Sequence, residues 1–345
     1  MSIFSSGIIL AQHKEPALSH KIITFLNPRS SEHRLSSAPV RGPALPHPDV
    51  LIQIAREAEI YDDYSRRPLY QSLYECRENT VAIVVDAVDD EPYVSSRLAP
   101  MLQLQEELIS GIQICEHICG VHKTMILVYK YLSGIQSHIP SKIGDYPVIK
   151  VRGGYPAKPT AAQLRSLGRG KKLFISVGSA IHLFRAVRLA VKQHTCFVTV
   201  AGGCVSRPLN MEVSIGMPLS QVLERVGLID EPTHIVCGGP MRGVAVTNPE
   251  HTVIVPETRA VLAFKRRKSQ NFAACIGCGR CEQFCPAGLN PSYIHRHVIK
   301  GYYNALRNFD VHLCIDCGTC SYICPSRQNT AGSVARAKGR LAVDN

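Results

Sequence analysis

The sequence lacks the features that mark membrane-spanning, secreted and repetitive proteins. No stretch approaches the roughly eighteen consecutive apolar residues that a membrane-spanning helix needs, and low-complexity tracts are absent. The first ten residues contain no basic segment of the kind that opens a secretory signal peptide, so we expect none. With 345 residues, 45% of them hydrophobic, the chain can bury a core in two or three domains. We therefore expect a globular, cytoplasmic protein.

Motifs of nucleic-acid binding are also missing, although the formal charge is +12. The sequence contains no helix-turn-helix, zinc-finger spacing or stacking-aromatic motif, so we expect no nucleic-acid partner. Basic residues are spread along the chain except for one group, Lys265, Arg266, Arg267 and Lys268. This group is either a solvated linker or a docking patch for an acidic redox partner or an anionic membrane face.

Cysteines, in contrast, are plentiful, and eight of the fourteen form two copies of one pattern. Both copies read Cys-x2-Cys-x2-Cys-x3-Cys-Pro, the run that ligates [4Fe–4S] clusters. In two-cluster proteins the fourth cysteine of each run ligates the cluster of the other run. The first predicted cluster is therefore held by Cys275, Cys278, Cys281 and Cys324. The second predicted cluster is held by Cys314, Cys317, Cys320 and Cys285.

The residues beside the cysteines support this interpretation over its alternatives. Gly279 and Gly318 each follow a ligand, where a side chain would crowd the sulfides or block N–H bonds to sulfur. Zinc is one alternative, but zinc sites usually take four ligands in paired Cys-x2-Cys halves, so both runs would carry surplus cysteines. Disulfides are the other, but eight clustered thiols without a secretory signal fit a reducing compartment better.

Six further cysteines lie outside the runs, and we expect most of them to be buried. They are Cys76, Cys115, Cys119, Cys196, Cys204 and Cys237. Cys115 and Cys119 are four residues apart on an apolar helix face, where they could clip a metal, but buried cysteines usually act as small hydrophobic residues. The fourteen histidines contain no His-x3-His or His-Glu-x2-His pair, so none is assigned a metal.

Before the first long helix, the chain is expected to be extended and irregular. Residues 1–27 are predicted to form a short extended unit, and residues 28–48, rich in Ser, Pro, Arg and His, a linker. Asp49 is expected to cap the helix that follows. The apolar face of this helix is predicted to hold Leu51, Ile54, Ala55 and Ala58.

The middle of the chain alternates between strand and helix patterns. Residues 80–88 and 124–131 are predicted strands with a helix over 102–119 between them, which indicates a parallel α/β sheet. A further strand at 173–177 and an amphipathic helix at 180–192 continue the pattern. Residues 196–260 are predicted to form a small α+β unit of several strands and one helix at 219–226. A helix is expected between the two cysteine runs, within 291–309, and the last eighteen residues are expected to be loosely ordered.

Several segments, in their order along the chain, resemble one family. Tyr155 and Pro156 precede a helix-forming stretch, residues 198–202 lead on to residues 215–219, and residues 237–243 read Cys-Gly-Gly-Pro-Met-Arg-Gly. Followed by the two cysteine runs, these segments resemble the RnfC family, the peripheral NADH- and flavin-linked iron–sulfur subunits of Rnf electron-transport complexes. Cobalamin reductases and the electron-transfer protein of proline reductase are relatives. The resemblance covers about residues 49–327.

The resemblance implies a multidomain α/β and α+β fold. Residues 49–195 would form a Rossmann-like α/β domain, residues 196–262 a small β-grasp domain of the soluble-ligand-binding (SLBB) type, and residues 263–330 a bacterial-ferredoxin-type, α-helical two-cluster module. A short N-terminal segment and linker at 1–48 and a flexible tail at 331–345 complete the chain.

The chain departs from the family where the family binds its cofactors. The family's N-terminal barrel-like domain shrinks to residues 1–48. Its glycine-rich loop, Gly-x-Gly-Gly-Ala-Gly-Phe-Pro, lets backbone N–H groups approach a cofactor phosphate, but residues 59–68 here read Glu-Ile-Tyr-Asp-Asp-Tyr-Ser-Arg-Arg-Pro. The two aspartates would repel a phosphate, although Arg66 and Arg67 could bind one through their side chains.

The family's acidic cofactor strand is matched by residues 86–93. Glu91 and Tyr93 survive there and are the expected FMN or NADH contacts of a degenerate site. We therefore expect two [4Fe–4S] clusters as cofactors, while the missing glycines argue against FMN and NADH.

These observations predict an iron–sulfur protein that passes single electrons through two [4Fe–4S] clusters to or from a partner reductase. No catalytic residue is assigned. The expected partner is a flavoprotein, ferredoxin or reductase, with peripheral association with a membrane complex at the inner face of the membrane. Two alternatives remain: an active NADH- and FMN-dependent oxidoreductase of RnfC or cobalamin-reductase type, and a zinc-binding structural module.

Overall fold

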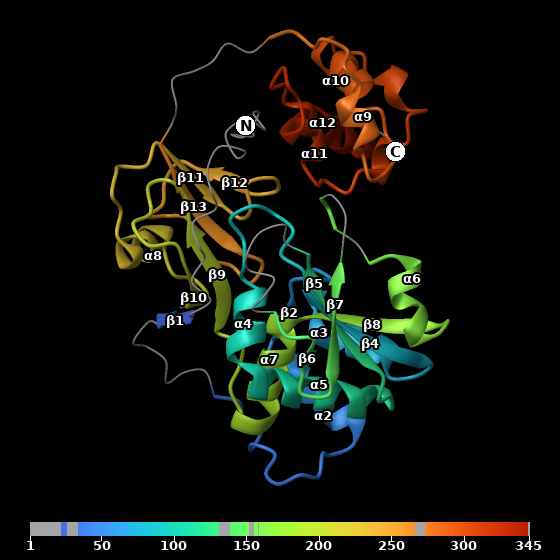
Figure 1. Ribbon diagram of the computed structural model, residues 1–345, viewed down its shortest axis with the longest axis vertical. Coiled ribbons are helices and arrows are strands. Elements are labelled where there is room, and N and C mark those ends of the chain that lie inside the picture. The colour runs from blue at the N-terminus through green and yellow to red at the C-terminus, as the bar shows by residue number, and fades with distance from the viewer. Residues whose placement is uncertain are drawn as a thin grey trace.

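A five-stranded sheet, a six-stranded sheet and a C-terminal group of helices make up the computed structural model (Figure 1). The structure describes residues 22–25, 34–130, 139–151, 155–157, 159–265 and 273–343. Within these residues, no helix has the length and apolar character needed to cross a bilayer.

The five-stranded sheet is mostly parallel and has the order β6-β7-β5-β4-β8. Its strands are β4 (Thr80–Ala87), β5 (Thr124–Tyr129), β6 (Lys142–Ile143), β7 (Tyr146–Val151) and β8 (Lys171–Ser176). β4 lies between two parallel neighbours and is buried along almost its whole length, as a central parallel strand should be. The strands predicted at 80–88, 124–131 and 173–177 are therefore confirmed, and they lie in one sheet.

Helices cover one face of this sheet and enclose the largest core of the protein (Figure 1). They are α2 (Pro48–Glu57), α3 (Leu69–Cys76), α4 (Leu98–Gln103), α5 (Gln105–Cys119) and α7 (Val177–Leu189). The opposite face is covered by the segment that carries α6 (Ala161–Leu164). Helices on both faces agree with the predicted Rossmann-like α/β domain.

The first long helix, α2, buries the predicted apolar face, but its N-cap lies two residues earlier than expected. Its N-cap is His47, whose ring nitrogen Nδ1 accepts a bond from the Asp49 N–H at 3.4 Å, so the prediction that Asp49 caps the helix is wrong. Cys115 and Cys119 of α5 lie in the core, and burial raises the pKa of Cys119 to about 12 and that of Cys115 well above its ordinary value. Both cysteines therefore behave as small hydrophobic residues.

Part of the predicted linker is fixed to the end of α7. The Leu35 N–H donates to the Ala190 carbonyl and the Val40 N–H to the Val187 carbonyl, both at 2.8 Å. Leu35 is buried in the same core. A free linker over all of residues 28–48 is therefore the wrong description, because residues 34–48 pack on the α/β domain.

The six-stranded sheet is mixed and has the order β1-β10-β9-β13-β11-β12. Its strands are β1 (Ile22–Phe25), β9 (Thr195–Ala201), β10 (Leu209–Ser214), β11 (His234–Cys237), β12 (Val244–Val246) and β13 (Ala260–Phe264). Helix α8 (Leu219–Val226) lies where a helix was predicted and packs its apolar side on the sheet. The sheet also recruits β1 from the N-terminal segment, so this unit extends beyond residues 196–262.

The C-terminal module is helical, as predicted. It contains α9 (Arg280–Gln283), α10 (Pro291–Ile299), α11 (Thr319–Tyr322) and α12 (Thr330–Val343) around a small apolar core. The predicted flexible tail is wrong for residues 331–343, because these belong to α12. Val334 and Ala337, three residues apart, are buried in the module core, so one apolar stripe holds this helix in place.

Candidate electron-transfer module and the region beside it

The two cysteine runs fold alike. Gly279 and Gly318 are the N-caps of α9 and α11, with φ of +72° and +76°, a left-handed conformation that favours glycine. Each run thus places its third cysteine, Cys281 or Cys320, in the first turn of a short helix. The glycines predicted to spare the sulfides also serve a backbone requirement that the sequence did not reveal.

The thiols of the two runs lie near one another across the module. Burial raises the pKa of Cys281, and the neighbouring Cys324 raises it further, so the third cysteine of the first run lies beside the fourth of the second. Burial raises the pKa of Cys320 to about 12, with Cys317, Cys314 and Cys281 of the first run as thiol neighbours. This grouping supports the predicted ligand sets, which stay a prediction cysteine by cysteine.

Backbone N–H groups already point at several of these sulfurs. The Leu289 N–H lies 3.3 Å from Cys285 Sγ, and the Gln328 N–H lies 3.4 Å from Cys324 Sγ, so each fourth cysteine accepts a bond from four residues onward. Bonds of this type stabilise thiolate ligands and tune cluster potentials. Eight thiols, some of them with such donors, fit two cubanes. Across the described residues, no three Cys, His, Asp or Glu side chains converge tightly enough for a single metal ion.

The second run packs against the rest of the protein (Figure 1). A Cβ built on Gly318 would lie 2.2 Å from the carbonyl oxygen of Met241, in the turn between β11 and β12, so the two backbones touch. The Thr319 hydroxyl donates to the Tyr155 carbonyl at 3.5 Å and lies 3.3 Å from Cys317 Sγ. The Tyr-Pro and Gly-Gly-Pro-Met segments therefore form the seat of the second run.

Glu91, a predicted FMN or NADH contact, holds this turn. Its carboxylate accepts bonds from the backbone N–H groups of Met241 at 3.0 Å and Arg242 at 3.3 Å, and from Arg242 Nε at 3.2 Å. Gly239 passes so close that a Cβ there would lie 1.9 Å from a Glu91 oxygen. Tyr93, the other predicted contact, is 8% exposed and packs edge-on against Phe264. Both side chains are thus engaged inside the protein.

A second arrangement lies at the carboxyl end of the parallel sheet, where the glycine-rich loop was expected. Asp62 is fully buried there and places its carboxylate at the N-terminus of α7. It accepts bonds from the Ser176 N–H at 2.9 Å, the Ser179 hydroxyl at 2.8 Å and the Ser65 N–H at 2.9 Å. The N–H groups and positive end of a helix dipole usually attract an anion. Here a side chain of the protein itself is that anion.

Beside Asp62, a buried ion-pair network fills the space between β4 and the loop. Arg97 bonds Asp63 through Nε at 2.9 Å and also bonds Asp86 at the end of β4, while Arg259 bonds Asp89. Burial alone would raise the pKa of Asp63, but the two guanidinium groups outweigh it and lower that pKa. For Asp86 burial prevails and raises the pKa to about 6, despite Arg97 and Arg259. The sequence did not predict this network, because no motif around Arg97 indicates that its side chain pairs with these aspartates.

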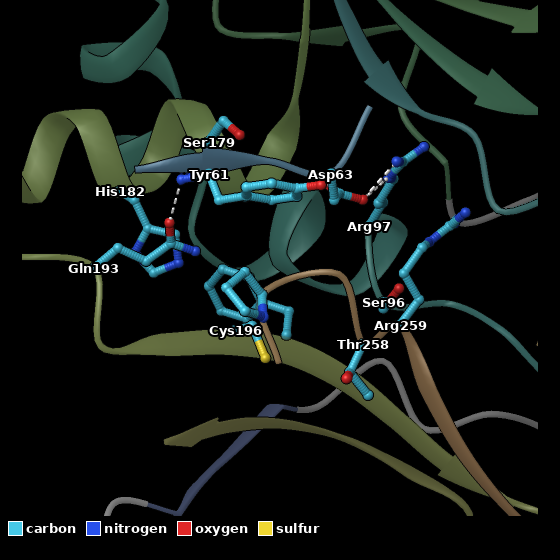
Figure 2. Close-up of a pocket in the computed structure, with 13 residues that line it drawn as sticks. Tyr61, Asp63, Ser96, Arg97, Ser179, His182, Gln193, Cys196, Thr258 and Arg259 are labelled. Atoms are coloured by element: carbon cyan, nitrogen blue, oxygen red, sulfur yellow. Dashed lines mark hydrogen bonds and ion pairs between the residues drawn. The ribbon is translucent and has the colours of Figure 1, made fainter. Parts of the chain in front are cut away.

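The cavity that remains is small (Figure 2). Its volume is about 30 Å³, and Tyr61, Asp63, Arg97 and His182 are among the residues that line it. That is room for roughly two water molecules. Burial, and then the charge of Arg185, lower the pKa of His182 to about 3, so this imidazole is neutral. The residues present therefore do not fit the phosphate or the ring system of a flavin nucleotide.

Comparisons with known proteins support both the two-cluster module and the β-grasp domain. A family model described as "4Fe-4S dicluster domain" matches residues 267–325, and one described as "SLBB domain" matches residues 197–245. NAD+-reducing [NiFe]-hydrogenase is similar in fold in its air-oxidised and H2-reduced crystal structures. The TM-scores are 0.54 and 0.52 at 12% and 13% identity, covering 86% of this chain and 66% and 61% of those chains.

Curated relatives share sequence over much of the chain. The C subunit of the ion-translocating oxidoreductase complex of Rhodobacter capsulatus is 28% identical over 64% of this chain and 46% of its own length. The subunit of the same name from Vibrio cholerae is 27% identical over 73% of this chain and 35% of its own. The C subunit of the proton-translocating ferredoxin:NAD(+) oxidoreductase complex of Clostridium ljungdahlii is 27% identical over 61% of this chain and 50% of its own.

The chain therefore spans half or less of the length of these relatives. The two family models match in the order that the sequence predicted, the SLBB domain before the cysteine runs. The resemblance to the RnfC family is confirmed, as are the mixed α/β fold with its SLBB domain and the two [4Fe–4S] clusters of the C-terminal module.

Proposed function

We propose that this chain is an iron–sulfur electron-transfer protein that passes single electrons between protein partners and does not oxidise NADH itself. The observation that carries the proposal is the carboxylate of Asp62 at the N-terminus of α7. Flavin and nicotinamide nucleotides usually bind parallel α/β sheets at the carboxyl ends of the strands, with a phosphate on a helix N-terminus. In this chain that position holds a buried carboxylate with three hydrogen bonds.

Electrostatics near this position would also oppose a phosphate. Asp63, Asp86 and Asp89 lie close by and form ion pairs with Arg97 and Arg259. A phosphate would have to displace Asp62 and approach three further carboxylates, while both of these guanidinium groups are already paired. Removing one partner from a buried ion pair costs about 3–5 kcal/mol, so rearranging the network to admit a nucleotide is unfavourable.

When bound, the two clusters supply reversible one-electron acceptance. The protein holds them through the eight cysteines and directs N–H groups of Leu289 and Gln328 at two of the ligand sulfurs. The turn fixed by Glu91 seats the second run on the body of the protein. In this proposal the α/β domain has become a scaffold for the cluster module.

The partners belong to the same proposal. We infer a flavoprotein, ferredoxin or reductase as the electron donor or acceptor, and a peripheral place at the inner face of the membrane, within a complex of the kind that the names of the curated relatives describe. The similarity of those relatives over three fifths or more of this chain supports this inference.

Anaerobic purification with counts of iron, sulfide and flavin tests the proposal. We expect about eight iron and eight sulfide per chain, no flavin, full reduction by dithionite and none by NADH alone. Stoichiometric flavin, or reduction by NADH, would instead establish the NADH-dependent oxidoreductase. Zinc without acid-labile sulfide would establish the zinc-binding structural module.

A further inference from the structure

The two cysteine runs differ in how much of them reaches solvent. In the first run Cys275 and Cys278 are exposed, together with every residue from 273 to 278. In the second run Cys317 is buried and Cys314 is half-buried. The pattern Cys-x2-Cys is the same in both, so the tertiary environment alone creates the difference.

The cause is the seat of the second run. Gly318 touches the Met241 carbonyl and Thr319 bonds the Tyr155 carbonyl, whereas a Cβ built on Gly279 at the equivalent place in the first run would meet nothing within 4 Å. Gly318 and Thr319 of the second run therefore pack on the body of the protein, although Leu313 and Ile315 before them stay exposed. The first run makes no contact of this kind at Gly279.

Exposed apolar side chains, and the exposed Glu282, lie close in sequence to the exposed cysteines. Ile276, between Cys275 and Cys278, is 67% exposed, and Phe284, next to Cys285, is 49% exposed. Arg280 is exposed beside them. We call Ile276, Arg280 and Phe284 the outer surface. An apolar centre with charge beside it is the usual composition of a small, transient protein interface.

Charge favours an acidic occupant. Residues 273–343 contain eight Lys and Arg against three Asp and Glu, and the basic residues 265–268 lead into the first run. Two oxidised clusters with their thiolates add about four negative charges, which leaves this end of the chain positive. Complementary charge speeds the encounter of redox proteins and orients them. An anionic bilayer would match the charge but could not exchange an electron.

We propose that an acidic one-electron redox protein docks on the outer surface, so that electrons enter or leave beside Cys275 and Cys278. This proposal rests on the electron-transfer function proposed above. One electron passes from the reduced partner to this protein, or in the reverse direction, and no bond forms or breaks. The second run, which packs on the Met241 turn, is the inner end of the electron path.

The sequence offers a matched pair of variants for the test. Ile276 and Ile315 occupy the same place in the two runs, and both are exposed, at 67% and 43%, so neither substitution should disturb the core. The probe is a reduced, acidic plant-type [2Fe–2S] ferredoxin. Stopped-flow mixing with the oxidised holoprotein gives the rate of reduction, and thermophoresis gives the Kd for the oxidised pair.

We expect Ile276→Asp to slow reduction and weaken binding about tenfold, because it removes an apolar contact and repels the acidic partner. Ile315→Asp should stay within about twofold of wild type. For wild type and Ile315→Asp, the rate of reduction by the ferredoxin should fall as the salt concentration rises. Dithionite should reduce wild type and both variants equally.

Several outcomes would overturn the proposal. Equal effects of the two substitutions would show that the outer surface is not the docking site. A rate that rises with salt, or a ferredoxin that fails to reduce wild type, would exclude an acidic partner. Loss of vesicle binding in Ile276→Asp, with unchanged ferredoxin kinetics, would assign the surface to anionic lipid. Failure of dithionite to reduce wild type would contradict the proposed function instead.

Discussion

Replacing Gly318 with alanine should separate the cluster module from its seat, and the same change at Gly279 should not. Both glycines cap short helices at nearly identical φ, +76° and +72°, so alanine meets the same backbone penalty of about 1–2 kcal/mol at each place. Their surroundings differ. A new Cβ at 318 would lie 2.2 Å from the Met241 carbonyl oxygen, while at 279 it would meet nothing within 4 Å.

The size of the extra effect follows from this contact. The carbonyl cannot move aside cheaply, because the Met241 N–H is bonded to the buried Glu91 carboxylate at 3.0 Å. To reach an ordinary separation the module and the turn must part by more than 1 Å, and overpacking of this kind costs about 1–3 kcal/mol. Gly318→Ala should therefore be about 1–3 kcal/mol less stable than Gly279→Ala.

Two measurements on the anaerobic holoproteins check this difference. The midpoint of thermal unfolding should be lower for Gly318→Ala than for Gly279→Ala by several degrees, at about 2–4 °C per kcal/mol. An EPR-monitored redox titration should show one of the two clusters shifted in potential in Gly318→Ala, because that cluster gains water. Equal thermal midpoints and equal redox titrations in the two variants would refute the contact of Gly318 with the Met241 turn.

Three further predictions concern the charges of the body. Asp62→Ala should destabilise the protein by about 3 kcal/mol, because it leaves the Ser176 N–H and the Ser179 hydroxyl at the start of α7 without their acceptor; a thermal midpoint within about 1 °C of wild type would contradict this role. Glu91→Gln should cost about 1–2 kcal/mol and shift the same cluster as Gly318→Ala; a shift in the other cluster would contradict the coupling through Met241. The pKa of Asp86 is raised to about 6 in the folded protein, above its ordinary value of 3.8 in the unfolded chain. Between about pH 4 and 6 the folded protein therefore keeps a proton on Asp86 that the unfolded chain has lost. The contribution of Asp86 to stability falls as pH rises through this range and then stays level. The stability of wild type relative to Asp86→Asn should follow that curve in urea unfolding at stepped pH, and a difference independent of pH would show that Asp86 is ionised throughout.

Much of the fold could be predicted because its signals are local. The apolar run at residues 80–88 and the helical spacing of Leu108, Ile112 and Cys115 lie within single elements, and the structure contains those elements. Helix α12 escaped prediction because its apolar stripe, Val334 and Ala337, is too sparse to stand out in a basic, small-residue segment. It forms because α10 offers those residues a surface to bury against.

The candidate site was predictable in part for the same reason. Loss of the glycine-rich loop was visible in residues 59–68, and the sequence indicated that two aspartates there would repel a phosphate. That Asp62 would bond the start of α7, 114 positions further along, was not visible. Neither was the use of Glu91 to hold a turn 150 positions away.

The sequence by itself determined the chemistry of the clusters, because the eight predicted ligands come from two short runs whose spacing is a property of the chain alone. Only the tertiary structure decided which run packs on the body of the protein and what fills the family's cofactor region. Those properties depend on contacts between residues far apart in sequence: Gly318 on Met241, Glu91 under that turn, and Asp62 at the start of α7. Such contacts leave no periodic or spaced pattern, since each joins one residue to a distant stretch of backbone that only the folded protein brings near.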